Sequence, residues 1–275
     1  MTMDFPALRE IVAGAGTRGA STLCRPEFWE AALRLLARAS FISIVTGFFI
    51  QSADAPETDG PPGAVVLGRA LERVGKRVAL CTDQRNYACL KACSQSVKGP
   101  VVVCVDAPER VAGADTLVFI ERPGHAADGR YYNMRGDDVS GVTAPLDLAA
   151  ERALTRGVPV LGIGDGGNEA GMGLLYEPLA VLLPHYAACL SKVSATVCLP
   201  VDVSNWGAYA LAAALSTFYR RWLGLGEGEE VVLLQALADA GAVDGISGKR
   251  GLTVDGVSPA RLGQVSSELR RWCDA

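Results

Sequence analysis

Short apolar segments without a polar face alternate along this chain with segments of helical periodicity. The apolar segments are rich in valine and isoleucine, as in VVVCV and VPVLGI. Strands that helices cover on both sides have this composition, because neither face meets water. The alternation therefore predicts a doubly wound, mostly parallel α/β sheet with helices on both faces, a Rossmann-like three-layer fold.

The order of the segments gives the expected elements. Strands are expected in FISIVTG, RVALCTD, VVVCV, TLVFIER, VPVLGIGD and ATVCLPVDV. Helices are expected over residues 26–39, 63–74, 84–95, 146–156 and 208–222, and as a pair around the turn-rich DGISGKRGLTVDG segment. A loop of about twenty residues after TLVFIER is long enough to be functional.

Length and composition indicate one globular unit. The chain has 275 residues, of which 49% are hydrophobic and 20% charged, which excludes a disordered chain. We expect a single α/β domain over residues 1–275, with an N-terminal helical segment (1–40) and a C-terminal helical segment (224–275) packed on it.

Charge and hydropathy exclude several classes of protein. The net charge is −4 and the basic residues are scattered, so we expect no nucleic acid partner. Apolar stretches stay below the ~18 residues of a membrane span, and the N-terminus lacks a secretory signal pattern. The eight cysteines contain no CxxC pair and are predicted to be reduced thiols of a cytoplasmic protein. Self-association into a homo-oligomer is compatible with this sequence.

Each expected strand switches to polar residues at its C-terminal end. In a parallel sheet these ends share one edge, where open α/β folds bind ligands. The residues concerned are Thr46 and Gly47, Asp83, Glu121 and Arg122, Asp165, and Ser204 and Asn205. Polar residues after strands are expected in any case, but a convergence of carboxylates, a guanidinium and an amide on one edge indicates a binding site.

The run GIGDGGNEAGMG, Gly162 to Gly173, directly follows one of these strands, and six of its twelve residues are glycine. Glycine lets backbone amides approach a ligand closely, and Asp165 and Glu169 add two acids. The run lacks the ending of a phosphate-binding P-loop and matches a dinucleotide fingerprint only weakly. A simpler interpretation is a tight turn in which Asn168 caps a helix beginning near Glu169.

Two other segments carry residues typical of a site. The segment ETDGPPG places Glu57 and Asp59 before a proline-led helix start, and the long loop contains Asn133 and Arg135 in YYNMRGDD. Each has a structural alternative, a proline turn and a solvated loop. The chain contains no serine–histidine–aspartate order, nucleophile elbow or histidine metal motif.

The strings TGFFI, ETDGPPGA, ERPG, DGRYYNMRG, GIGDGGNEAGMG and SNWG, in this order, resemble the D-glutamate cyclase family. The resemblance spans roughly residues 41–210. It implies a hydro-lyase that converts D-glutamate to 5-oxo-D-proline with loss of water. The substrate would be a small amino acid, and no membrane partner is implied.

This chemistry requires an acid, a base, a cation for the α-carboxylate and donors for an oxyanion. We assign proton transfer to Asp165 and Glu169, and the oxyanion to the amides of Gly166 and Gly167. Arg122 is expected to clamp the carboxylate, and the other substrate-binding residues are expected to be Thr46, Gly47, Glu121, Asn133, Arg135, Asn168, Ser204 and Asn205.

Glu57 and Asp59 are expected to add acid–base function. No cofactor is required, but a divalent cation, Mg²⁺ or Mn²⁺, is compatible with these acids, with Asp83 and Asp165 as its ligands. Two alternatives stay open: a non-catalytic binding module for a small acid or phosphorylated metabolite, and an enzyme acting on a related amino acid.

Overall fold

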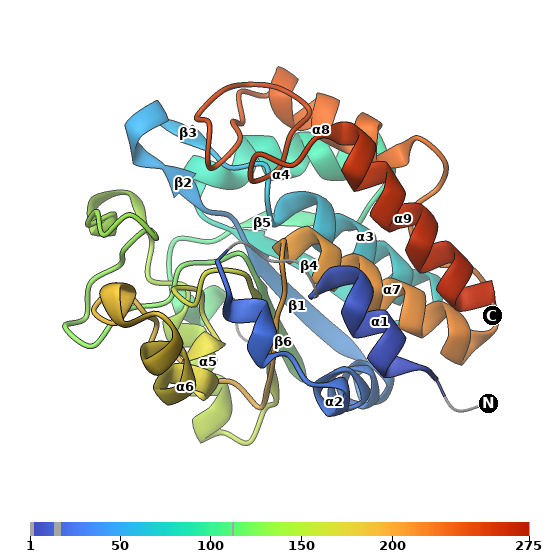
Figure 1. Cartoon of the computed structure of the whole chain (residues 1–275), viewed down its shortest axis with the longest axis horizontal. Coiled ribbons are helices and arrows are strands. Elements are labelled where there is room, and N and C mark those ends of the chain that lie inside the picture. Colours follow the sequence, from blue (N-terminus) through green and yellow to red (C-terminus); the bar gives the residue numbers. More distant parts are fainter. Residues whose placement is uncertain (1–2, 14–17, 112, 275) are drawn as a thin grey trace.

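The protein is built around a six-stranded parallel sheet with the strand order β5-β4-β1-β6-β7-β8 (Figure 1). The computed structural model describes residues 3–13, 18–111 and 113–274. The strands of the sheet are β1 (Phe41–Thr46), β4 (Arg77–Thr82), β5 (Val102–Cys104), β6 (Thr116–Ile120), β7 (Val160–Gly164) and β8 (Val197–Pro200). Two short strands, β2 (Phe49–Ile50) and β3 (Ala55–Pro56), pair separately as an antiparallel ribbon.

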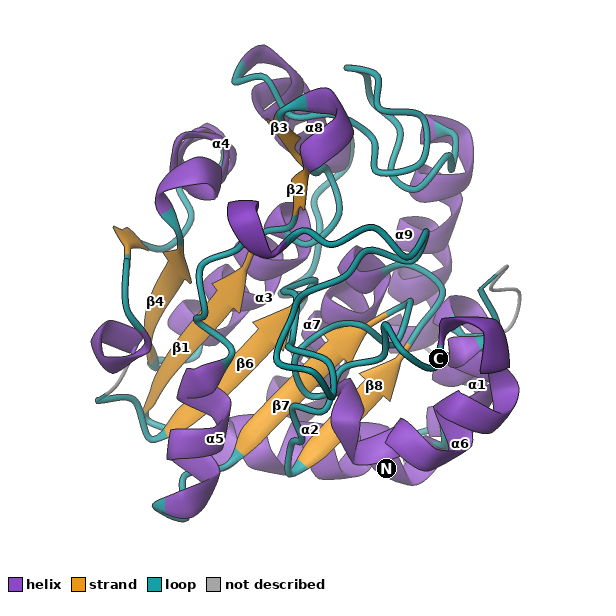
Figure 2. Ribbon diagram, turned by 90° about the vertical axis from the view of Figure 1, so that its left-hand side faces the viewer, coloured by secondary structure: helices purple, strands orange, loops and turns teal. Residues whose placement is uncertain are grey.

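Helices cover both faces of the sheet, which confirms the predicted three-layer α/β fold (Figure 2). One face packs on α2 (Pro26–Arg38), α3 (Pro61–Arg73) and α7 (Ser204–Tyr219). The other face packs on α5 (Leu148–Thr155) and a 3₁₀ helix, Pro108–Val111. The remaining helices are α1 (Phe5–Val12), α4 (Gln84–Ser96), α6 (Tyr176–Leu182), α8 (Glu229–Asp239) and α9 (Pro259–Asp274).

Side chains of the central strands alternate between two hydrophobic cores. In β6, Val118 and Ile120 join the core under α3 and α7, whereas Leu117 and Phe119 join the core under α5. Successive side chains of a strand point to opposite faces, so a strand that is apolar throughout supplies both layers. This is the physical basis of the apolar pattern in the sequence.

Helix α7 begins four residues before its predicted start at Ala208. The backbone N–H groups of Ser204 and Asn205 each donate to the carboxylate of Asp59, at 2.8 Å, and this satisfies donors that a helix start leaves unpaired. The partner comes from a distant loop, which a local pattern does not reveal. The helix ends at Tyr219, because Arg220 takes a left-handed conformation with φ of 55°.

The two ends of the described chain lie side by side (Figure 1). Helix α9 packs beside α1, and the indole N–H of Trp272 donates to the carbonyl of Asp4 at 2.8 Å. The predicted pair of C-terminal helices is confirmed as α8 and α9, and the organisation as one domain stays a prediction. All eight cysteines are free thiols, as predicted. Within the described ranges no helix is long and apolar enough to cross a membrane.

Candidate active site

The candidate site lies where the strand order of the sheet reverses. The chain runs from β1 outward to β5, returns across the sheet to β6, and then proceeds to β8. The carboxyl ends of β1 and β6 flank the crevice that this reversal creates, the usual ligand position in doubly wound sheets. Glu121 follows β6 directly, and Asp165 follows the next strand, β7.

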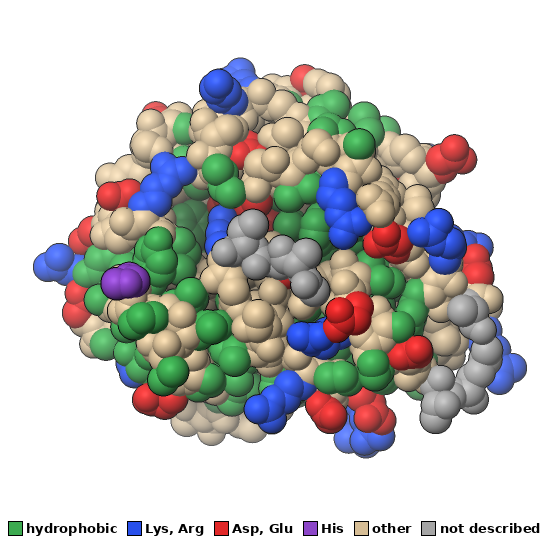
Figure 3. Space-filling view, in the orientation of Figure 1, with side chains coloured by type: hydrophobic (Ala, Val, Ile, Leu, Met, Phe, Trp, Pro, Cys, Tyr) green, Lys and Arg blue, Asp and Glu red, His purple; other side chains and the backbone are tan. Residues whose placement is uncertain are grey.

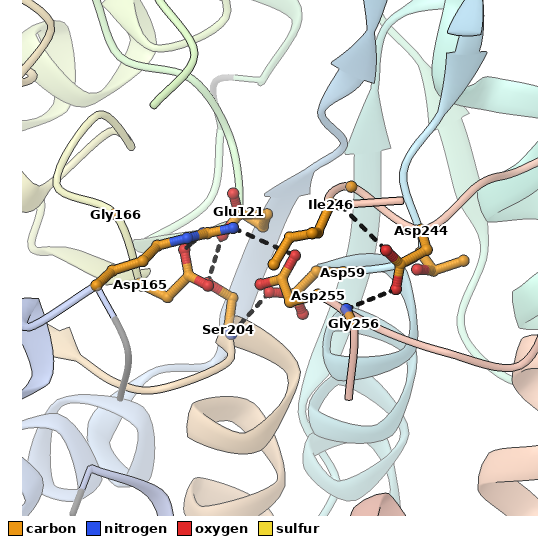
Figure 4. Close-up of polar contacts among 12 residues, drawn as sticks. Asp59, Glu121, Asp165, Gly166, Ser204, Asp244, Ile246, Asp255 and Gly256 are labelled. Carbon is orange, nitrogen blue, oxygen red and sulfur yellow. Dashed lines mark hydrogen bonds and ion pairs between the residues drawn. The ribbon is translucent and has the colours of Figure 1, made fainter. Parts of the chain in front are cut away.

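Three buried carboxylates meet at this edge. Asp59, Glu121 and Asp165 each place an oxygen so that these three atoms lie within 4.8 Å of one another. Their side chains point toward one another from three separate segments (Figure 4). Glu57 is also buried and lies close enough to interact electrostatically with Asp59 and Glu121. The structure therefore brings together Glu57, Asp59, Glu121 and Asp165, all of which the sequence predicted as site residues.

The main chain holds Asp59 in place. Its carboxylate accepts hydrogen bonds from Ser204 and Asn205, at the N-terminus of α7, and from its neighbour Gly60 at 3.0 Å. The positive end of a helix dipole favours an anion at this position. Asp59 therefore belongs both to the acid cluster and to the start of α7.

Glu121 is held under backbone strain. Its φ is +45°, a left-handed conformation that residues other than glycine rarely adopt. The hydroxyl of Ser204 donates to its carboxylate at 2.6 Å. Strained residues of this kind concentrate at functional sites, where surrounding contacts hold them.

Two charged residues of the site were missed by the sequence reasoning. Arg18 pairs with Asp165 through one terminal nitrogen, and its other terminal nitrogen lies 3.4 Å from Asp255. Asp255 sits in the turn-rich segment between α8 and α9, with a φ of 52°. An arginine in a loop and an aspartate in a turn are usually solvated, so neither carried a sequence signal.

Burial within this cluster makes its acids hard to ionise. It raises the pKa of Asp59 to about 8, with the nearby carboxylate of Asp255 as the next cause. Burial also raises the pKa values of Glu57, Glu121 and Asp165 well above their usual range. Arg18 opposes this rise at Asp165 and Glu57, because a nearby cation favours the charged form.

These shifts predict that metal-free protein loses stability as the pH rises through the range set by Asp59. Its pKa is 3.8 in the reference state and about 8 in the fold, so between these values the folded state holds a proton that the unfolded state has lost. The contribution of Asp59 to the free energy of unfolding then falls with rising pH and levels off above pH 8. Urea unfolding in a chelator from pH 5 to 8.5 measures the slope. Asp59→Asn should make it shallower, because the contributions of Glu57, Glu121 and Asp165 remain. An identical slope in both proteins would exclude Asp59 as one of its sources.

A cavity of about 450 Å³ opens beside the cluster. Arg18, Glu57 and Glu121 line it together with Asn133, Arg135 and Asn168, three of the residues predicted to bind substrate. Acidic side chains are visible in a recess of the face shown in Figure 3. The remaining lining residues are Phe48, Phe49, Ile50, Gln51, Ser52, Met134, Leu183, Tyr186, Gly245 and Ile246.

The long loop after β6 lines the cavity of the candidate site through Asn133, Met134 and Arg135. Arg135 donates to the carbonyls of Ile246 at 2.9 Å and Gly245 at 3.3 Å, and so joins this loop to the C-terminal segment. A Cβ at Gly245 would lie 1.6 Å from a carboxylate oxygen of Glu57, so a larger residue there would force the Glu57 side chain to move. Two distant loops therefore close the cavity together.

The glycine run holds one of its own acids rather than presenting open amides. The Glu169 carboxylate accepts from the N–H groups of Asp165 (3.1 Å), Gly166 (2.7 Å) and Gly167 (2.7 Å). The expectation that the Gly166 and Gly167 amides are free for an oxyanion is therefore wrong. Glu169 is fully buried and does not line the cavity, although it lies close enough to Glu121 to raise the pKa of that carboxyl.

The predicted helix cap at Asn168 is also wrong. No helix begins at Glu169, which instead forms a bridge with Pro123, and Met172–Leu175 is the next helical turn. The Asn168 side chain donates to the carbonyl of Tyr132 at 2.8 Å, and Asn168 is part of the cavity wall. The compact loop takes its shape from Glu169 instead of from a helix start.

Arg122 and Asp83 form a separate, enclosed pair. Arg122 is 1% exposed and donates to Asp83 at 2.6 Å, to the carbonyl of Gly47 at 3.0 Å and to the carbonyl of Ala144 at 2.5 Å. Arg122 lowers the pKa of Asp83 against the effect of burial, and Asp83 also caps α4. This geometry contradicts a substrate clamp at Arg122 and a metal ligand at Asp83.

Thr46, Gly47, Ser204 and Asn205 support the site from behind rather than lining its cavity. Thr46 is fully buried at the end of β1. The Asn205 side-chain oxygen accepts from Gly60 at 3.0 Å and Gly63 at 2.8 Å, and so fixes the turn that carries Asp59. In this structure Ser204 and Asn205 orient acids.

The donor set suits a hard divalent cation. Asp59, Glu121 and Asp165 are the one such group of metal-ligating side chains within the described chain, and all three supply carboxylate oxygens, as Mg²⁺ and Mn²⁺ prefer. Their burial beside Glu57 and Asp255 concentrates negative charge that a cation would offset. The candidate ligands are therefore these three rather than the predicted pair of Asp83 and Asp165.

Comparisons with known proteins agree with the sequence motifs. Residues 8–270 match the family described as "D-glutamate cyclase-like, C-terminal". The mitochondrial D-glutamate cyclase of Homo sapiens is 36% identical over 231 residues, an alignment that covers 74% of this chain and 37% of that protein. The chain thus spans little more than a third of that relative's length.

A solved structure of an exopolyphosphatase-related protein from Bacteroides fragilis is distantly similar. It shows 12% identity and a TM-score of 0.44, covering 91% of this chain and 58% of that one. A likeness of this size carries no argument about function.

Proposed function

Because the chain belongs to the D-glutamate cyclase-like family, we propose that it is a hydro-lyase that cyclises D-glutamate to 5-oxo-D-proline with loss of water. The observation that carries this proposal is the group of buried acids beside a cavity of about 450 Å³. Cavities of this size typically hold small ligands. The substrate assignment rests on the name of a longer relative.

The reaction moves protons without consuming them. The α-ammonium of D-glutamate loses two protons, its nitrogen bonds to Cδ, the carbon of the γ-carboxylate, and one oxygen of that carboxylate leaves with two protons as water. A site for this step must relay protons and hold one at neutral pH, which requires a carboxyl group of raised pKa. The acid cluster meets this requirement.

We assign proton donation to Glu121, because it lines the cavity and burial raises its pKa. Glu57 lines the same cavity and is placed to accept a proton from the ammonium. Asp59 and Asp165 do not line the cavity, but each has a carboxylate oxygen within 4.8 Å of one of Glu121, so they can exchange protons with it. Glu169 has no part in this scheme, since three backbone N–H groups hold its carboxylate.

A divalent cation fits the same residues. Asp59, Glu121 and Asp165 would hold it, and when bound it would polarise the γ-carboxylate and offset the negative charge of the cluster. Measuring the rate of 5-oxoproline formation with Mg²⁺, with Mn²⁺ and with a chelator decides whether the cation is needed.

The direct test incubates the protein with D-glutamate or L-glutamate and follows 5-oxoproline by chromatography, with each metal and with chelator. We expect 5-oxo-D-proline from D-glutamate well above the rate of a buffer control. Neither enantiomer reacting under any condition would contradict the proposal. If D-glutamate then still raised the melting temperature, the chain would be a binding module.

A further inference from the structure

Building on the proposed function, we infer that Arg18 binds the α-carboxylate of the substrate and so sets the preference for an α-amino acid. The reaction requires a cation that holds this group while the amine reaches the far carbon. Arg122, the residue that the sequence favoured, is enclosed and already bound to Asp83 and two carbonyls.

Arg18 lines the cavity, whereas Arg122 does not. The Arg18 side chain is 28% exposed and lines the cavity beside Glu57 and Glu121. Among the described lining residues, the cations are Arg18 and Arg135. Arg135 lies at the exposed rim, where it binds the carbonyls of Gly245 and Ile246. Arg18 is therefore the cation nearest the acids that would act on the substrate.

Two acids orient the Arg18 guanidinium. Asp165 pairs with one terminal nitrogen, and Asp255 lies 3.4 Å from the other. A guanidinium has five N–H donors in one plane, so it can hold two acids and still donate to a third carboxylate.

The charges of the cavity make this cation necessary for an anionic substrate. Glu57 lines the cavity and must be ionised to accept a proton from the ammonium, so the α-carboxylate of a bound amino acid would meet a like charge there. Asp165, the largest cause, raises the pKa of Arg18 further, so the guanidinium stays charged at every working pH. A ligand without an α-carboxylate would gain nothing from this contact.

Asp255 acts as a positioning residue for Arg18. The segment that carries it is pinned by Asp244, which accepts from the N–H groups of Ser247 at 2.7 Å, Gly256 at 2.8 Å and Ile246 at 3.1 Å (Figure 4). The turn-rich C-terminal segment thereby places the Asp255 carboxylate beside Arg18.

The test compares two ligand pairs in wild type, Arg18→Gln and Arg18→Lys. D-glutamate and 4-aminobutanoate differ only in the α-carboxylate, and both can close a five-membered lactam with loss of water. Arg18→Gln should lower kcat/KM for D-glutamate about 100-fold, mainly through KM, and leave 4-aminobutanoate within about tenfold. Arg18→Lys should restore little, because lysine lacks the planar fork.

Calorimetric binding of glutarate and butanoate repeats the comparison without turnover. Glutarate should lose affinity in Arg18→Gln by a similar factor, and butanoate should not. Arg34→Gln is the matched control, because Arg34 pairs with Glu30 on the exposed face of α2. Asp255→Asn should weaken glutarate binding less, and should add little in the Arg18→Gln background.

The outcomes separate the two proposals. Equal losses for both members of each pair, or an unchanged preference for the ligand with the second carboxylate, would overturn the role of Arg18. Wild type that binds glutarate through Arg18 but makes no 5-oxoproline would overturn the cyclase proposal alone.

Discussion

Glu121→Gln is expected to lower kcat for D-glutamate by about 10²–10⁴-fold while the protein stays folded. Glutamine keeps an oxygen that can accept from the Ser204 hydroxyl, at the place where that bond is 2.6 Å in wild type. Glutamine lacks the proton that the departing oxygen needs. The substitution therefore tests proton donation while the contact with Ser204 is kept. Turnover of purified variant and wild type at saturating D-glutamate gives the measurement.

The same substitution should not destabilise the fold. Burial and the neighbouring Glu169, Asp59, Glu57 and Asp255 raise the pKa of Glu121, so ionising it in the fold is unfavourable. A neutral side chain removes this penalty, and each kcal/mol relieved would raise the Tm by about 2–4 °C at pH 8. Glu109→Gln, at an exposed acid paired with Arg152, is the control for both readouts. Unchanged kcat would remove Glu121 from the mechanism, and a large drop in Tm would show that its role is structural.

Glu169→Ala is expected to destabilise the protein by about 3 kcal/mol or more. The substitution leaves the buried N–H groups of Asp165, Gly166 and Gly167 without their acceptor, and each such loss typically costs about 1–3 kcal/mol. Glutamine retains one suitable oxygen but turns an NH₂ group toward backbone donors, so Glu169→Gln should recover only part of the loss. Urea unfolding at one pH measures the free energy of unfolding of each protein.

An exposed neighbour supplies the comparison for this prediction. Glu177, in the first turn of α6, is exposed, and Glu177→Ala should change stability by no more than about 0.5 kcal/mol. If Glu169→Ala had an equally small effect, the carboxylate would not be what holds the glycine run. Activity lost by Glu169→Ala would follow from displacement of Asp165, the residue that begins the loop.

The sequence predicted which edge of the sheet gathers the polar residues better than it predicted the hydrogen bonds and ion pairs among them. Glu121 and Asp165 were placed correctly because the C-terminal ends of parallel strands share one edge whatever their order. The pairing of Asp83 with Arg122 depends on strand order. β4 and β6 both flank β1, which puts the residues that follow them within reach of each other. A single sequence does not contain that order.

The missed residues share a different cause. Arg18 and Asp255 meet only because the N-terminal loop and the segment between α8 and α9 both fold over the same edge of the sheet. Neither residue has a periodic or motif signal of its own. The glycine run shows the opposite case, since its amides do converge as predicted but the acid four positions after Asp165 fills them.

The hydrogen bonds between Asp59 and the first turn of α7 allow the charge of Asp59 to be followed by nuclear magnetic resonance. Because the N–H groups of Ser204 and Asn205 donate to this one carboxylate, their amide resonances depend directly on its charge. Titration of Asp59, or occupation of the cluster by a cation, would therefore change the two backbone amide signals of Ser204 and Asn205. The first turn of α7 allows the charge of the site to be followed without a substrate.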